Sequence, residues 1–87
     1  MIKFSILDRK NMATSKITVY QNGKPKKNVK VSLEYTGWSQ NGFTKSFYTN
    51  NDGIAYVEHS STGNAKVYLN GNPEGSLTTP GQEIFYL

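Results

Sequence analysis

The sequence predicts an all-β protein, a small antiparallel β-sandwich of about seven strands. Short runs alternate apolar with polar residues, which is the period of strands that are buried on one side. Turn signals such as Asn-Gly, Asp-Gly and Pro-Gly separate these runs at about the 8–12-residue spacing of sandwiches and barrels. No segment has a helical period, and 87 residues suit a single domain.

The composition excludes several classes of site. The chain has no cysteine, so it can form neither a disulfide nor a thiolate metal site. Its hydrophobic fraction of 36% is enough for two facing sheets but not for a cofactor cavity as well. The first apolar run ends at Leu7, too short for a signal peptide or a membrane span. We therefore expect a cytoplasmic protein, with export by a non-classical route or as part of an assembly as the alternative.

Residues 1–15 have two interpretations. Ile2, Phe4 and Ile6 alternate as in an edge strand, whereas the polar stretch from Asp8 favours an N-terminal extension. Met12 is followed by Ala-Thr-Ser, a common kind of bacterial start, and is therefore a second candidate for the natural initiator. Residues 16–87 are expected to form the sandwich domain.

The first two strands of the domain are expected at 16–21 and 29–35. In the first, Ile17 and Val19 alternate with outward residues. Asn22-Gly23 then turns the chain, and Pro25 keeps the preceding residue extended. The second strand has the clearest register, with the inward residues Val29, Val31, Leu33 and Tyr35.

Asp52-Gly53 predicts a β-hairpin between strands at 43–49 and 54–59. Glycine reaches positive φ without a Cβ penalty, and aspartate can bond its own backbone. In the second of these strands, Ala55 and Val57 are expected to face inward.

The last strands follow the same pattern. Residues 65–69 alternate, with Ala65, Val67 and Leu69 inward. Asn70-Gly71 and residues 73–75 are expected to close that strand, and 76–79 to form a short edge strand. Pro80-Gly81 turns the chain into a final strand at 83–87.

Turn and core residues form three blocks: G-x-P-x-x-x-V-x-V-x-L from Gly23, T-x-x-D-G-x-A-x-V from Thr49, and G-x-A-x-V-x-L from Gly63. In this order and spacing they resemble the carboxypeptidase regulatory-like domains, which share the transthyretin-like (prealbumin-like) sandwich. The resemblance implies a transthyretin-like, Ig-like fold and a non-catalytic docking or spacer role. The fold-specifying turn residues are Gly23, Pro25, Asp52, Gly53 and Gly63.

The sequence predicts no enzyme. The hydroxyisourate hydrolases of the transthyretin-like group need several histidines and a C-terminal Tyr-Arg-Gly-Ser, but this chain has His59 alone and ends Ile-Phe-Tyr-Leu. His59 could act as a base beside Glu58 or Asp52, yet no serine stands out as a nucleophile. One imidazole without cysteine cannot make a typical zinc site. We therefore expect no catalytic residue, no metal and no cofactor.

Tyrosines at outward positions suggest a contact surface. Tyr20, Tyr48, Tyr56 and Tyr68, with Ile54, fall opposite the core phase of their strands. On neighbouring strands they would form one aromatic patch, of the kind found at protein interfaces. The alternative is that exposed tyrosines stabilise the strands through cross-strand pairs.

Two other groups have competing interpretations. Lys24, Lys26, Lys27 and Lys30 surround the first turn, but without arginine or interleaved aromatic residues they favour a solvated turn over a nucleic-acid site. Tyr35, Trp38 and Phe43 could form a sugar-stacking platform, or Trp38 could fold back as a lid over the end of the sandwich.

The sequence thus predicts a non-catalytic module that docks to a partner protein or to itself. Carbohydrate binding through the Trp38 loop is the alternative. We expect neither nucleic-acid binding nor membrane insertion.

Overall fold

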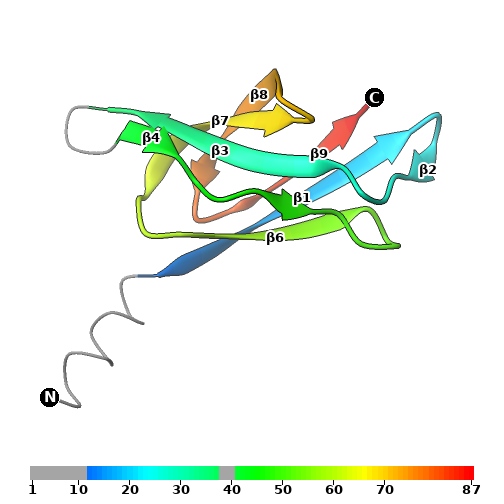
Figure 1. Cartoon of the computed structure of the whole chain (residues 1–87), viewed down its shortest axis with the longest axis horizontal. Coiled ribbons are helices and arrows are strands. Elements are labelled where there is room, and N and C mark those ends of the chain that lie inside the picture. The colour runs from blue at the N-terminus through cyan, green and yellow to red at the C-terminus, as the bar shows by residue number, and fades with distance from the viewer. Residues whose placement is uncertain (1–11, 38–40) are drawn as a thin grey trace, which may run out of the picture.

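The computed structural model describes residues 12–37 and 41–87, and within them it has strands and no helix (Figure 1). The strands form two packed sheets, which confirms the predicted all-β sandwich. The predicted strand at the start of the chain and residues 38–40, which include Trp38, lie outside the described residues.

Sheet A is built around its longest strand, β1 (Ala13–Gln21). β6 (Ile54–His59) pairs with β1 antiparallel, and β9 (Gln82–Tyr86) pairs with β1 in parallel. β2 (Lys24–Pro25) forms a short hairpin with the end of β1 and continues the line of β6, since Val19 N–H donates to Gly53 O and Lys26 N–H donates to Val19 O. Strands from three distant parts of the chain therefore meet in this sheet.

Sheet B is built around β3 (Lys30–Thr36). β7 (Gly63–Leu69) pairs with one side of β3, and β8 (Asn72–Thr79) pairs with β7 as the outermost strand. The opposite side of β3 is covered by β4 (Asn41–Phe43) and β5 (Phe47–Tyr48). Between these two short strands, Thr44 remains attached to β3 through Leu33.

The inward residues predicted from the alternating pattern are buried, as expected. Hydrophobic side chains from β1, β3, β6, β7 and β8, together with Val29 just before β3, form one core between the sheets, with Phe47 and Phe85 packed against it. Because strand side chains alternate between faces, the predicted phase of β3, β6 and β7 also places their polar partners on the outside. The core members are Ile17, Val19, Val29, Val31, Leu33, Tyr35, Ala55, Val57, Ala65, Val67, Leu69 and Leu77.

The predicted hairpin at Asp52-Gly53 is wrong. β5 pairs with β3 in sheet B, while β6 pairs with β1 in sheet A, so the turn carries the chain from one sheet to the other. The turn itself is well formed: Asn50 Oδ1 accepts hydrogen bonds from the N–H groups of Asp52 and Ile54. Turn chemistry fixes the reversal of the chain, whereas the strands that pair are selected by the packing of the whole domain.

The last edge strand is longer than predicted. Residues 73–75 do not end the preceding strand but belong to β8, which begins at Asn72. Pro73 lies opposite Tyr68, next to a register shift between Val67 and Tyr68. Proline is accepted here because the other side of β8 pairs with no described strand.

Candidate functional site

His59 is part of a buried hydrogen-bonded cluster at one end of the core. Its Nδ1 lies 2.7 Å from the carbonyl oxygen of Ser61, which can only accept, so Nδ1 carries the hydrogen. In the neutral ring, Nε2 then accepts from the Ser15 hydroxyl at 2.8 Å. Gly81 N–H donates to the same Ser15 Oγ at 3.2 Å. The cluster therefore joins β1, β6 and the β8–β9 turn.

This arrangement resembles a nucleophile, a base and an orienting group. Ser15, however, is completely buried, so a substrate cannot reach its hydroxyl. The two acids expected beside His59 are not its partners: the exposed Glu58 faces the other side of β6, and Asp52 lies in the turn before the opposite end of β6. The geometry favours a structural role for His59, which with Ser15 links β1 and β6 to the β8–β9 turn.

Replacing Ser15 by alanine tests this role. Ser15→Ala leaves His59 Nε2 and Gly81 N–H without the partner they share, so we expect a loss of about 1–3 kcal/mol of folding stability. Urea unfolding followed by circular dichroism measures the change. The exposed Ser76→Ala, on the outer face of β8, should be almost neutral. Equal stability of the two variants would contradict the proposed link.

Tyr35 does not belong to a sugar platform. It is buried, and its hydroxyl lies 2.7 Å from Thr79 Oγ1, which donates in turn to the carbonyl oxygen of Gly63. Phe43 is exposed, but on the outer face of sheet B, where its ring contacts Tyr68 edge-on at 4.9 Å between ring centres. Trp38 lies outside the described residues. Because Tyr35 is buried, it cannot be part of the predicted sugar-binding surface.

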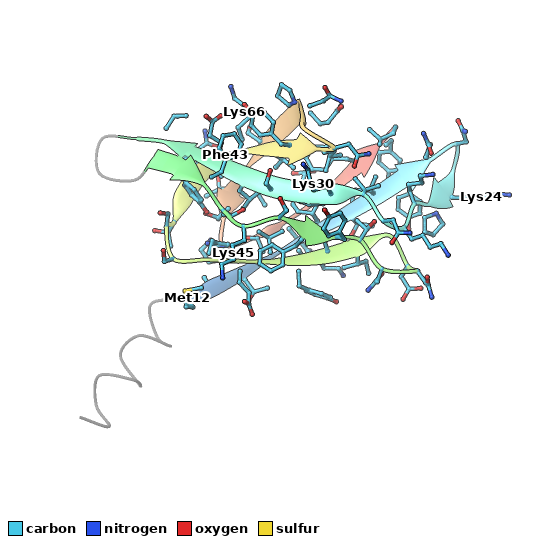
Figure 2. The ribbon with its side chains drawn as sticks, in the orientation of Figure 1. Met12, Lys24, Lys30, Phe43, Lys45 and Lys66 are labelled. Atoms are coloured by element: carbon cyan, nitrogen blue, oxygen red, sulfur yellow. The ribbon has the colours of Figure 1, made fainter. Side chains whose placement is uncertain are left out.

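A cleft of about 330 Å³ opens between β6 and the segment that joins β4 to β5. Met12, Lys45 and Phe47 line it, together with the ends of Glu58 and His59. Figure 2 shows Met12 and Lys45 at the lower left of the sandwich, and Phe43, which also lines the cleft, above them. Within residues 12–37 and 41–87, no group of three or more His, Cys, Asp or Glu side chains could hold a metal ion.

The outer face of sheet A has an apolar band across three strands. In register, Thr18 lies between Ile54 of β6 and Ile84 of β9. Next to this row, Tyr20 stacks on Tyr86 with ring centres 5.6 Å apart. A shallow groove of about 540 Å³ follows β9 and is lined by Lys16, Thr18, Gln82, Glu83, Ile84 and Tyr86.

The outer face of sheet B combines aromatic rings with charges. Glu34 lies between Phe43 of β4 and Lys66 of β7, while Lys30 lies opposite Tyr48 of β5. The Tyr68 hydroxyl donates to Glu34 Oε1 at 2.9 Å. This hydrogen bond to a carboxylate raises the pKa of Tyr68, so the hydroxyl keeps its proton to a higher pH than an ordinary tyrosine does.

The predicted interface residues do point outward, but they do not form one patch. Tyr20, Ile54 and Tyr56 belong to sheet A, while Tyr48 and Tyr68 belong to sheet B, on the opposite side of the sandwich. The sequence interpretation also missed Ile84 and Tyr86, which are among the exposed large hydrophobic residues. Their alternation with Glu83 and Phe85 along β9 was the signal that could have identified them.

The predicted turn residues lie where the backbone needs them. Gly23, Gly53 and Gly63 have positive φ angles of 81°, 75° and 100°. Pro25 lies opposite Tyr20 at the first hairpin, and Asp52 is exposed beside Gly53. Such conformations account for the glycines by fold alone.

Comparison with known proteins adds no ligand or partner. None of the described segments forms a helix that is long and apolar enough to cross a membrane. The chain matches no protein-family model and no curated protein, so the resemblance to carboxypeptidase regulatory-like domains rests on its turn and core residues.

Proposed function

We propose that this chain is a non-catalytic β-sandwich module that binds an extended segment of a partner protein along β9. The observation that carries the proposal is the open edge of β9 beside exposed apolar side chains. Ile84 is 46% exposed and Tyr86 75% exposed on the outer face of sheet A. Within the described chain, β9 pairs with β1 alone.

The hydrogen bonds define which backbone groups of β9 are free. Lys16 N–H donates to Gly81 O, and Leu87 N–H donates to Tyr20 O. In the parallel register, the odd-numbered residues of this segment therefore face β1, and the N–H and C=O groups of Gln82, Ile84 and Tyr86 point away. Only Ile84 N–H has another contact, at 3.4 Å from Glu83 Oε2. A partner strand that adds to a sheet needs such a row of unpaired backbone N–H and C=O groups along the edge.

The β8 edge of sheet B is protected against pairing with another chain in ways that the β9 edge of sheet A is not. β8 carries Pro73 and a register shift, both of which discourage pairing with another chain. β9 has no proline, lysine or bulge. Its one charged residue, Glu83, faces the inner side opposite Ile17, where it also discourages pairing unless it is matched.

Glu83 indicates the chemistry of the partner. A segment with apolar residues on the outer side would cover Ile84 and Tyr86, and a lysine or arginine on the inner side would match Glu83. A second copy fits less well. Antiparallel pairing of two β9 strands around Ile84 would place Glu83 opposite Phe85, without a charge partner. We therefore favour a foreign segment.

A strand-forming peptide tests the proposal. The probe has about eight residues, alternates valine with polar residues, and carries one lysine to meet Glu83. Binding should slow amide hydrogen exchange at Gln82 and Tyr86, whose N–H groups face no strand in the free protein, and at Ile84, whose N–H contacts only Glu83 Oε2. Ile84→Asp should weaken binding by about 1.4 kcal/mol or more, a factor of ten, in calorimetry.

Tyr48→Asp is the matched control, because Tyr48 is 60% exposed on the opposite sheet. It should leave peptide affinity unchanged. Unchanged exchange at the β9 amides, or equal losses in both variants, would contradict the proposal. A dimer in light scattering that Ile84→Asp abolishes would assign this edge to a second copy instead.

A further inference from the structure

We infer that the outer face of sheet B binds single-stranded nucleic acid, independently of the β9 edge on the opposite sheet. The sequence argued against such a site because its lysines lack arginine and interleaved aromatic residues. Sheet pairing supplies the aromatic residues: Tyr48 of β5 lies opposite Lys30 of β3, and Phe43 and Tyr68 line a pocket together with Lys30.

Two lysines of this face form a short track across the sheet, Lys30 of β3 and Lys66 of β7. Figure 2 shows Lys30 near the middle of the molecule and Lys66 further to the left. Lys26 and Lys27 are exposed between the first hairpin and β3. A row of exposed ammonium groups complements the phosphates of a nucleic-acid backbone.

Two exposed rings lie along the same track. Phe43 is 58% exposed and Tyr48 60% exposed, the degree of exposure that stacking on a base requires. Their partners on β3, Glu34 and Lys30, are on the same face, which places the rings about 13 Å apart along the strand. Tyr68 supports Phe43 from the side, so the Phe43 ring is held against the sheet.

A shallow pocket of about 300 Å³ adjoins the Phe43 ring. Its walls include Ser32, Phe43 and Tyr68, with Lys30 at one side. Glu34 is half-buried nearby and is held by the Tyr68 hydroxyl. A carboxylate repels phosphate but accepts hydrogen bonds from the amino groups of bases, so it favours a base over the backbone at this position. Glu74 is the other acid of sheet B, on its outermost strand.

The test uses fluorescence anisotropy of the full chain with a labelled mixed-sequence oligonucleotide of about 12 nucleotides, in low salt. Phe43→Ala and Tyr48→Ala should each weaken binding about five-fold or more, the loss of one stacked base. Lys30→Ala should lower the slope of log affinity against log salt by about 0.7, the loss of one phosphate contact. Thermal unfolding checks that each variant is folded.

Tyr56→Ala is the control, because Tyr56 is 55% exposed on the outer face of sheet A. It should bind like the unchanged protein. No binding at low salt overturns the inference, and so does binding that depends on Lys30 but on neither ring, since it would be charge attraction alone. Competition by an uncharged oligosaccharide that is lost in Phe43→Ala would also overturn it, and would assign the face to a sugar.

Discussion

Gly53→Ala is expected to destabilise the domain by about 2–5 kcal/mol. Gly53 has a φ of +75°, which costs an L-residue about 1–2 kcal/mol. A Cβ there would also lie 2.5 Å from Val19 O and 3.1 Å from Lys26 N, both backbone atoms. Moving them disturbs the junction of β1, β2 and β6, and such overpacking costs about 1–3 kcal/mol more. Chemical denaturation followed by tryptophan fluorescence measures the sum.

Gly23→Ala separates the two causes. Gly23 has a similar φ of +81°, but a Cβ there would meet nothing within 4 Å. It should lose the conformational part alone, about 1–2 kcal/mol. If both variants lose the same free energy of unfolding, the close approach of Val19 O and Lys26 N to Gly53 contributes nothing to the loss of stability.

Thr49→Val is the second large effect, with an expected loss of about 2–4 kcal/mol. Thr49 is buried, and its hydroxyl accepts from Val29 N–H at 2.9 Å while donating to the carbonyl oxygen of Lys26 at 2.7 Å. Valine keeps the shape of the side chain but leaves both backbone groups without this partner. Urea denaturation measures the loss.

Thr78→Val is the matched control, because Thr78 is exposed on the outer face of β8. It should change stability by less than about 0.5 kcal/mol. Thr49→Val should also speed hydrogen exchange at Asn28 N–H, which donates to Thr49 O, if the segment before β3 loosens. Equal denaturation midpoints for the two variants would show that the Thr49 hydroxyl contributes nothing to stability.

The sequence predicted the parts of the fold that depend on local pattern. Alternation along β3, β6 and β7 identified which side chains are buried, since a one-residue slip would expose them all. The connection at Gly53 was mistaken for a hairpin because two strands joined by a tight turn usually pair. Here β5 finds its partner in β3 and β6 in β1, and this choice depends on contacts between distant segments.

The candidate sites were predictable to the same extent. The strand period showed that Tyr20, Tyr48, Tyr56 and Tyr68 point outward, but only the sheet assignment shows that they divide between two faces. The partner of His59 could not be predicted, because Ser15 is 44 positions away in sequence and one serine among many. Turn and core residues specify the fold, while the pairing of distant strands determines which exposed residues lie next to one another.

The order of strands in sheet A also determines how the chain can fold. Apart from the short hairpin with β2, its central strand β1 takes its partners from residues 54–59 and 82–86, and each of these two pairings closes a long loop. Parallel pairing with β9 cannot start from a local turn, and the entropy of loop closure is lost before those contacts form. A topology of this kind gives slow folding. Until residues 82–86 dock, β1 has an unpaired edge, and the unfinished domain is exposed to aggregation.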